Sequence, residues 1–493
     1  MARAAKTNVS SAARDYGRDY PLIVDLDGTL IRTDSLHESL CKLAREKPSV
    51  LWQLPRWCLG GKARLKEQVA LHTKINPDTW PVNRELLDWL TAQRADGRTL
   101  VLCTAADRTV AQAIGGNLGI FDEILASDGT RNLAGMSKAE ALVQRFGHQG
   151  FDYVGNSHHD LAVWRHARRA IVVNASQGLT ERADACSTVE RVFSPPAVGL
   201  AVWGRVLRLH QWLKNLLLAV PIIAAHEVMR PDLLTPFVLA FLSFSLTASA
   251  VYICNDLLDL EDDREHPRKA SRPFAAGLVP VGMGLALVPL LIAVSLTSAF
   301  SIGRPFVSWL LVYLGVTCAY SFWLKRLLLI DCLTLAMLYT VRILAGASVA
   351  DIEPSFWLMA FSCFFFLSLA FAKRYAELRL LSHAGQDHAR GRAYRISDAP
   401  LIQILGITSG YAAVVVMALY LNSASVVKLY RTPQVLWAGI PVTLFWISWM
   451  WTQAHRELLH EDAVVFAVTD RVSLLTGVAF ACVLAAGTVT WSW

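Results

Sequence analysis

Charged residues are scarce in this chain of 493 residues, and cysteines are scarcer. Asp, Glu, Lys and Arg make up 18% of the sequence and hydrophobic residues 54%, whereas a soluble domain carries about 25% charged residues. Disordered chains are polar and highly charged, so this composition excludes disorder. The nine cysteines form no CxxC pair, which excludes a small disulfide scaffold. The net charge of +7 is mild and leaves nucleic acid, anionic lipid or a phosphorylated substrate open.

Long apolar runs are absent before about residue 195 and dominate from about residue 200 onward. A helix needs about 20 apolar residues to cross the hydrocarbon of a bilayer. The stretches that approach this length are about 212–226, 232–254, 277–300, 305–323, 327–348, 355–372, 401–421, 434–452 and 472–491. We therefore expect an all-α membrane domain of about nine transmembrane helices over residues 200–493.

Loop charges predict how this domain is oriented. The loops after the even-numbered stretches hold most of the loop lysines and arginines, whereas the opposite loops hold only Arg230, Arg304, Lys428 and Arg431. Cytoplasmic loops are the basic ones. Residues 1–19 contain basic side chains but no apolar core, so they predict a tail and not a signal peptide. The sequence predicts a multi-pass protein of a bacterial-type inner (plasma) membrane with a cytoplasmic N-terminal domain.

Strands and helices alternate in the first part of the chain. An apolar run from Pro21 ends in Asp25-x-Asp27, and further strands are expected over residues 99–104, 153–155 and 170–173. Helical patterns lie between them. This alternation predicts an α/β domain with helices on both faces of a parallel sheet. Carboxylates at the carboxyl end of a buried strand lie where α/β folds place their sites.

Polar residues suited to phosphoryl transfer follow the expected strands and open a helix. They are Asp25, Asp27, Thr104, Lys138, Asn156 and Asp160. Phosphoryl transfer requires a nucleophile, an acid/base, a donor to the phosphate oxygens, a cation and a magnesium site. Over about residues 20–190, this ordered set resembles the haloacid dehalogenase (HAD) superfamily, which consists mostly of phosphatases.

The HAD resemblance implies a role for each residue. Asp25 matches the nucleophile and Asp27 the general acid/base. Thr104 matches the phosphate-binding hydroxyl and Lys138 the charge-neutralising lysine. Asp160 matches a magnesium-site acid, so that it would hold Mg²⁺ together with the two earlier aspartates and the asparagine of the set.

One position departs from the HAD pattern. The family usually has Asp where this chain has Asn156, and the missing charge is expected to weaken magnesium binding. A non-catalytic HAD-like domain, kept for packing or regulation, therefore stays open as an alternative. In either case the domain is expected over residues 20–195, with a helical cap at about 32–95.

An acidic cluster follows the second apolar stretch. Asn255, Asp259 and Asp263 are spaced i, i+4 and i+8, so one continuous helix places them on a common face. Three oxygen side chains at one point suit Mg²⁺ that carries a diphosphate. Around this site, substrate-binding roles are expected for Asp256, Lys269 and Arg272.

An arginine deep in an apolar run is a second signal in the membrane domain. Arg342 requires a partner or an anionic ligand at this depth. Pairing with Asp331 is not expected, because the two lie about 16 Å apart along a helix.

The acidic cluster looks like the first aspartate-rich motif of the UbiA-type membrane prenyltransferase superfamily. Further short motifs look like its decaprenyl-phosphate phosphoribosyltransferase-like branch, over about residues 203–491. The substrate-binding residues that the resemblance implies are Lys214, Tyr320, Lys325, Arg342, Lys373 and Arg374. The superfamily folds as nine transmembrane helices around a cavity open to the cytoplasm and the lipid.

The loop after the sixth stretch separates two branches of that superfamily. Aromatic prenyltransferases carry a second DxxxD there, which holds another Mg²⁺. This chain has a basic loop instead, with Lys373, Arg374, Arg379, Arg390, Arg392 and Arg395 around the isolated Asp387 and Asp398. Basic side chains suit an acceptor monophosphate or a sugar 5-phosphate, although Lys373 could pair with Glu377 at i+4.

Together the resemblances imply a bifunctional enzyme that uses Mg²⁺ in both domains. The membrane domain would transfer 5-phosphoribosyl from phosphoribosyl diphosphate to polyprenyl (decaprenyl-like) phosphate. The HAD domain would remove the 5-phosphate, supplying a polyprenyl-phosphoryl-arabinose donor for arabinosylation of a glycan. The alternative is a 4-hydroxybenzoate-type polyprenyltransferase with a non-catalytic HAD-like domain. A homo-oligomer stays open, and nucleic acid is not expected as a partner.

Overall fold

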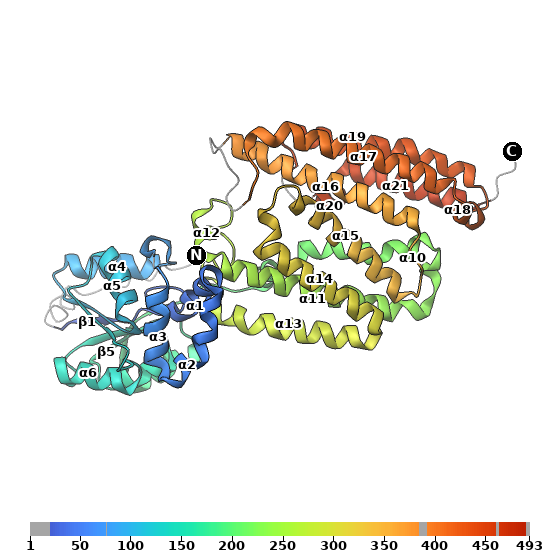
Figure 1. Ribbon diagram of the computed structural model, residues 1–493. Coiled ribbons are helices and arrows are strands. Elements are labelled where there is room, and N and C mark those ends of the chain that lie inside the picture. The colour runs from blue at the N-terminus through green and yellow to red at the C-terminus, as the bar shows by residue number, and fades with distance from the viewer. Residues whose placement is uncertain (1–19, 75, 384–391, 460–462, 490–493) are drawn as a thin grey trace, which may run out of the picture. The chain divides into compact units, whose positions relative to one another are not determined.

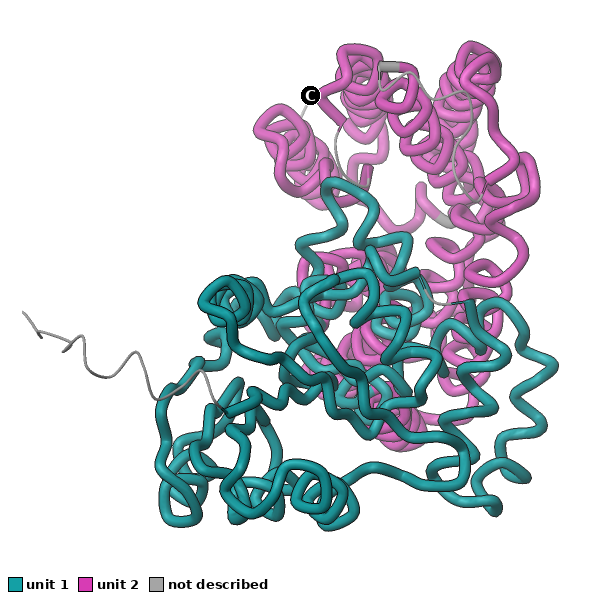
Figure 2. The backbone as a smooth tube through the Cα atoms, turned by 90° about the vertical axis from the view of Figure 1, so that its left-hand side faces the viewer, with its two compact units in different colours: residues 1–206, 253–287 teal, residues 207–252, 288–493 magenta. Residues whose placement is uncertain are grey.

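The computed structural model describes residues 20–74, 76–383, 392–459 and 463–489 (Figure 1). The chain divides into two compact units, which Figure 2 colours separately. The first unit runs through Val206 and also includes Ile253–Leu287, and the second comprises Leu207–Tyr252 and the chain from Val288. The segment with the acidic cluster therefore packs with the N-terminal part of the chain.

A six-stranded parallel sheet forms the centre of the first unit, in the order β3-β2-β1-β4-β5-β6. The strands are β1 (Leu22–Val24), β2 (Leu100–Asp107), β3 (Glu123–Ser127), β4 (Asp152–Gly155), β5 (Arg169–Val173) and β6 (Thr188–Phe193). The predicted α/β class is confirmed, and β3 and β6 are strands that the sequence reading missed. Since β1 lies between β2 and β4, the carboxyl ends of these three strands lie side by side.

Both faces of the sheet are covered, because successive strand residues point to opposite sides. Leu22 and Val24 belong to one core, and Ile23 belongs to the other. The helices of the first core are α4 (Arg84–Ala95) and α5 (Arg108–Leu118). The helices of the second are α6 (Met136–Phe146), α7 (Leu161–Trp164) and α8 (Gln177–Cys186).

A helical cap is inserted between β1 and α4. It consists of α1 (Ser35–Glu46), η2 (Pro48–Gln53), α2 (Leu54–Leu59), α3 (Gly61–His72) and η3 (Pro77–Thr79). Leu43, Trp57 and Val69 join α1, α2 and α3 in a small core of their own. The predicted cap segment is thus helical, but its last helix, α4, packs on the sheet through Leu86 and Leu90.

Among the described residues, seven helices are long and apolar enough to cross a membrane. They are Pro231–Leu258, Val281–Ile302, Arg304–Phe322, Ile330–Val349, Phe356–Ser382, Ile396–Leu421 and Pro433–His455. A pair bent by 80°, Ala463–Thr469 and Arg471–Gly487, makes an eighth if it is one span. The first expected stretch coincides with the shorter apolar segment Leu209–Ala224. The chain is a multi-pass membrane protein, and the predicted number of nine spans is approximate.

The helices that position polar groups in and near the membrane domain are labelled in Figure 1 where space allows. They are η5 (Leu209–Ala219), α10 (Val220–Ala224), α11 (Leu234–Leu258), α12 (Leu260–Glu265), α13 (Val281–Ile302), α14 (Arg304–Phe322), α15 (Ile330–Val349), α16 (Phe356–His383), α17 (Ala399–Leu421), α19 (Gly439–His455), α20 (Ala463–Thr469) and α21 (Arg471–Gly487).

Candidate functional site

A chain of buried polar side chains lies at the carboxyl end of β1. Lys138, in the first turn of α6, donates from Nζ to Asp25 Oδ1 (2.7 Å) and to the hydroxyl of Tyr153 (2.9 Å). The Tyr153 hydroxyl donates in turn to Asp160 Oδ1 (2.8 Å). All four side chains are buried. The structure therefore brings Asp25, Lys138 and Asp160 together as the sequence predicted, through a tyrosine that the sequence reading missed.

Burial sets the protonation of this site. It raises the pKa of Asp25, against the opposing effect of Lys138 and with a further rise from Asp160. It also raises the pKa of Asp27 to about 7, and the carboxylates of Asp34 and Asp25 add to that rise. Burial lowers the pKa of Lys138, but Asp25 and Asp160 outweigh it and the net pKa is raised. A carboxyl group that titrates near neutral pH suits general acid/base chemistry.

Asp27 contacts the first residue of the cap helix α1. Its carboxylate accepts a hydrogen bond from the backbone N–H of Ser35 (2.8 Å) and another from Ser35 Oγ (3.1 Å). Asp34 caps the same helix by accepting from the N–H of His37 (3.0 Å). The sequence reading missed Ser35, although a Ser after an Asp N-cap marks the start of α1.

Asp160 and Asn156 follow β4. Asp160 Oδ2 accepts from the N–H groups of Asn156 (3.0 Å) and Ser157 (2.9 Å) and from Ser157 Oγ (2.8 Å). Gly28, with φ +73°, lies against Asn156, because a Cβ on Gly28 would lie 2.1 Å from Asn156 Nδ2. The turn after Asp27 and the end of β4 are therefore in direct contact.

Thr104 lies within β2 and is fully buried. Its Oγ1 accepts a hydrogen bond from the N–H of Ala106 (3.0 Å). The next residue, Ala105, accepts from Nζ of Lys66 (2.6 Å), which projects from α3 of the cap. Burial lowers the pKa of Lys66, while Asp27 and other carboxylates of the site raise it. Lys66 is a cation of this site that its helical sequence context does not reveal.

The oxygens of this site fit Mg²⁺ by type, since hard cations prefer oxygen ligands. Asp25, Asp27 and Asn156 offer such oxygens, whereas Asp160 accepts four hydrogen bonds from protein groups. Asn156 adds no charge. In the part of the chain that the structure describes, no group of three or more His, Cys, Asp or Glu side chains is arranged to hold a metal.

The acidic cluster is interrupted by a helix break. α11 ends before Asp259, whose φ of −101° and ψ of 17° interrupt the helix, and α12 begins after it. Arg272 Nη1 donates to Asp256 Oδ1 (3.0 Å) and to Asp263 Oδ2 (2.6 Å). Across this irregular residue the backbone N–H of Asp259 still donates to the carbonyl of Asn255 (2.9 Å), and that of Asp263 to the carbonyl of Asp259 (2.8 Å). The common face of Asn255, Asp259 and Asp263 stays a prediction, and the structure adds Asp256, which Arg272 joins to Asp263.

A guanidinium thus stands between two carboxylates that are both buried, Asp256 and Asp263. Burial raises the pKa of Asp263, and the charges of Arg272 and Lys269 oppose the rise. Asp263 therefore requires a cation nearby. Two converging carboxylates around a positive group are a donor set that fits Mg²⁺.

Arg342, which is buried in the second unit, donates hydrogen bonds to protein oxygens. Arg342 Nε donates to Asn215 Oδ1 (2.9 Å), Nη1 to the carbonyl of Leu338 (2.6 Å) and Nη2 to the hydroxyl of Tyr313 (3.2 Å). A Cβ on Gly346 would lie 2.0 Å from the carbonyl oxygen of Leu218. That glycine lets α15 approach η5 closely, which brings Arg342 to Asn215.

Two residues that are predicted to bind substrate, Lys214 and Arg342, lie near the aromatic ring of Tyr339. Lys214 Nζ lies 5.9 Å from the ring centroid of Tyr339, and the Arg342 guanidinium lies 5.7 Å from it. Both cations are buried. The second unit therefore holds two positive groups close together at this point.

A second buried network surrounds Asp331, at the start of α15. Its carboxylate accepts from Arg374 Nη2 (2.5 Å), from Arg392 Nη1 (3.3 Å) and from the hydroxyl of Tyr394. Arg374 is fully buried and also donates to Glu377. Glu377 forms ion pairs with Arg374 and Arg392.

The remaining predicted residues of this region are more accessible. Tyr320, Lys325 and Lys373 are half-buried. Asp387 and Arg390 lie outside the described residues.

Comparison with known proteins identifies relatives of both parts of the chain. The model of the UbiA prenyltransferase family matches residues 216–475. The uncharacterized protein y4nM of Sinorhizobium fredii is 36% identical over 471 residues, which cover 94% of this chain and 90% of that protein. The nodulation protein NoeC of Azorhizobium caulinodans is 37% identical over 269 residues, 54% of this chain and 87% of that protein.

A third relative has a named activity. The decaprenyl-phosphate phosphoribosyltransferase of Mycobacterium tuberculosis is 37% identical over 198 residues, 39% of this chain and 66% of that protein. This chain therefore aligns with slightly less than two thirds of that enzyme.

Solved structures are less similar. A UbiA homologue from Archaeoglobus fulgidus, bound to GPP and Mg²⁺, is 16% identical with a TM-score of 0.45, covering 58% of this chain and 99% of that one. A substrate-bound phosphoserine phosphatase is 15% identical with a TM-score of 0.26, covering 36% of this chain and 93% of that one. The fold therefore rests on the strand order and the helices described above.

Proposed function

Because this chain belongs to the UbiA prenyltransferase family, we propose that its membrane domain transfers 5-phosphoribosyl from phosphoribosyl diphosphate to a polyprenyl phosphate. The relative of M. tuberculosis carries the name of this activity. The lysine and arginines at the end of α16 and in the segment after it favour phosphate groups over a second metal site. We assign this domain to residues 200–493.

The transfer joins a phosphate oxygen of the lipid to C1 of the ribose and breaks the bond from C1 to the diphosphate. The lipid phosphate is already anionic at neutral pH, so no strong base is needed. Arg272 and Lys269 would neutralise the departing diphosphate. Asp256 and Asp263, with Asn255 and Asp259 beside them, would hold Mg²⁺. Bound there, the metal supplies positive charge to the leaving group.

The other phosphates are assigned to cations of the second unit. Lys325 and Lys373 are half-buried and suit the 5-phosphate or the lipid phosphate. Lys214 belongs to the same proposal. Arg342 and Arg374 are held by protein oxygens, so we assign them to positioning the binding residues.

We further propose that the HAD-like domain, residues 20–195, removes the 5-phosphate from the lipid product. Asp25 would attack the phosphorus while Asp27 gives its proton to the departing sugar oxygen. Water would then attack the aspartyl-phosphate with Asp27 as the base. Lys138 and Thr104 would stabilise the phosphoryl oxygens.

Fusion of the two activities has a physical advantage. A product made by one domain meets a second domain on the same chain at high effective concentration. The observation that carries the proposal is the coexistence in one chain of the aspartate-rich segment and the buried cluster around Asp25. We propose that the dephosphorylated product feeds a polyprenyl-phosphoryl-arabinose donor for glycan arabinosylation, and that the N-terminal domain is cytoplasmic at the inner membrane.

Diphosphate release tests the transfer. The purified full-length protein is supplied with Mg²⁺ and either phosphoribosyl diphosphate plus polyprenyl phosphate, or a prenyl diphosphate plus 4-hydroxybenzoate. The proposal expects release that requires both members of the first pair. Release with the second pair alone would favour an aromatic prenyltransferase.

A further inference from the structure

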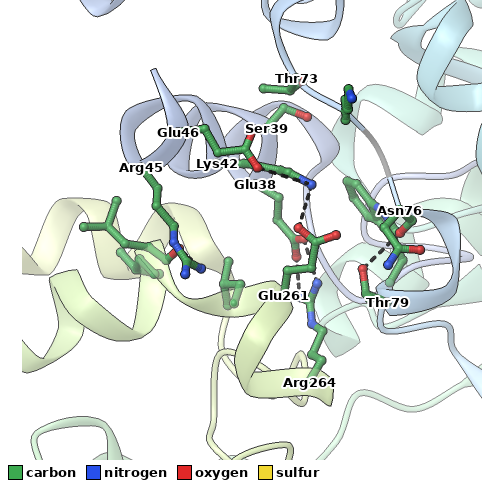
Figure 3. Close-up of a pocket in the computed structure, with 15 residues that line it drawn as sticks. Glu38, Ser39, Lys42, Arg45, Glu46, Thr73, Asn76, Thr79, Glu261 and Arg264 are labelled. Carbon is green, nitrogen blue, oxygen red and sulfur yellow. Dashed lines mark hydrogen bonds and ion pairs between the residues drawn. The ribbon is translucent and has the colours of Figure 1, made fainter. Parts of the chain in front are cut away.

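Oppositely charged side chains join the cap helix α1 to the aspartate-rich segment within the first unit (Figure 3). Lys42 Nζ lies 2.6 Å from Glu261 Oε2. Arg45 Nη2 lies 2.5 Å from Asp262 Oδ2, and its Nη1 lies 3.4 Å from Asp259 Oδ1. Lys42 and Arg45 of α1 thus form ion pairs with α12 and with Asp259, the residue before it.

The most buried of these ion pairs joins Arg264 of α12 to Glu38 of α1, and we call it the Glu38–Arg264 anchor. Arg264 donates to both oxygens of Glu38 at 2.8 and 2.5 Å, and the two side chains are 9% and 8% exposed. Lys42 and Arg45, at 22% and 34%, are in contact with water. These side chains line a cavity of about 50 Å³ beside α1. The pairs of Arg45 are therefore the ones that another cation can replace most easily.

Helix α1 connects two sites directly. Its first residue, Ser35, holds the carboxylate of Asp27 through the backbone N–H and the hydroxyl. Its last turn carries Arg45, which faces Asp259. A helix of this length spans about 18 Å, and the Glu38–Arg264 pair lies between its two ends.

We propose that the last turn of α1 responds to occupancy of the aspartate-rich segment, because Arg45 and a magnesium-bound diphosphate compete for the segment's carboxylates. The inference rests on the proposed function, which places Mg²⁺ at this segment. Without the ligand, Arg45 neutralises Asp259 and Asp262. With Asp259 engaged by Mg²⁺, Arg45 would lose this partner and the last turn of α1 would be freed, while the Glu38–Arg264 anchor would remain.

The test uses the full-length protein, Mg²⁺ and methylenediphosphonate, a diphosphate that does not hydrolyse. Binding is measured by titration calorimetry, and the backbone N–H exchange of α1 by mass spectrometry. Arg45→Met is expected to bind the diphosphonate about twofold to fivefold more tightly, since one partly exposed ion pair no longer competes. Arg56→Met, at an exposed arginine of α2 in the same cap, is the matched control and is expected to bind as the wild type does.

Exchange gives the second readout. In the wild type, the ligand is expected to speed exchange in the last turn of α1, and in Arg45→Met that turn exchanges fast without it. Lys42→Glu and Glu261→Lys are each expected to loosen α1, and the double charge swap to restore its protection. Restored protection in the double variant would show that the single variants lose the contact between α1 and α12 and not the fold.

Two failures are distinguishable. A wild type that binds no methylenediphosphonate, with Asp263→Asn equally inert, contradicts both the proposed diphosphate site and the coupling. A wild type that binds it, with unchanged or weaker affinity in Arg45→Met and no ligand effect on α1, overturns the coupling alone.

Discussion

The hydroxyl of Ser35 lowers the pKa of Asp27, the proposed general acid of the phosphatase. Asp27 accepts two hydrogen bonds from this residue, and the one from Oγ is 3.1 Å long. Both bonds lower the pKa of Asp27, which burial has raised to about 7. A hydrogen bond to a charged group contributes about 1.5 kcal/mol, and one pKa unit is about 1.4 kcal/mol. Ser35→Ala is therefore expected to raise the pKa of Asp27 further.

The sign of the effect follows from the role of Asp27. The first chemical step requires its protonated form, so kcat/KM is expected to fall as pH rises through the pKa of Asp27. The fall should occur near pH 7 in the wild type and about one pH unit higher in Ser35→Ala. Phosphate release from the lipid-linked 5-phosphate, measured between about pH 5 and 9, gives both profiles.

Ser39→Ala, one turn further along α1, is the matched control and should leave the profile unchanged. A Ser35→Ala profile that stays in place or moves to lower pH would refute the reasoning. The raised pKa also has a stability consequence. Between about pH 4 and 7 the folded protein keeps a proton on Asp27 that the unfolded chain has lost, so this group's contribution to stability falls as pH rises through that window.

Three further substitutions have defined outcomes. Lys138→Met removes the cation of Asp25 and is expected to lower the rate of phosphate release by about a hundredfold or more; a rate within tenfold of the wild type would contradict its role. Lys66→Met is expected to raise KM for the phosphorylated lipid about tenfold with kcat nearly unchanged, measured by steady-state kinetics, and a loss confined to kcat would argue against a binding role. Arg374→Leu leaves the buried carboxylate of Asp331 without its principal cation, at a cost of about 3–5 kcal/mol. The melting temperature of the detergent-solubilised protein should fall clearly, and an unchanged value would show that the other partners suffice.

The strands of the α/β part can be predicted from the sequence because they depend on short-range patterns of apolar and polar residues. Apolar runs ending in polar residues marked β1, β2, β4 and β5, and parallel strands bring their carboxyl ends to one edge. That is why Asp25, Lys138 and Asp160 were expected to share a site. β3 and β6 were missed because both are edge strands whose side chains are less buried than those of the inner strands.

The parts of the site that depend on packing between distant segments were not readable. Ser35 and Lys66 reach the HAD-like site only because the cap folds back over the sheet. Their own sequence neighbours show ordinary helical patterns. A contact between two helices far apart in the chain leaves no periodic signal in either of them.

Helical spacing predicts which residues of one helix share a face, but it does not predict their partners from distant segments. The carboxylate of Asp259 lies 3.4 Å from Arg45 of the cap, and Arg272 joins Asp256 to Asp263. Glu377 pairs with Arg374 and also with Arg392, which lies outside its own helix. Arg342 was expected to need a partner at membrane depth, and the structure supplies neutral oxygens.

Product analysis tests the central claim, that one chain makes a lipid-linked phosphoribose and then removes its 5-phosphate. Wild type and Asp25→Asn are incubated with Mg²⁺, phosphoribosyl diphosphate and polyprenyl phosphate, and the lipids are resolved by mass spectrometry. We expect polyprenyl-phosphoryl-ribose from the wild type and its 5-phosphorylated form from Asp25→Asn. Equal accumulation of the 5-phosphorylated lipid by both proteins would contradict the bifunctional account.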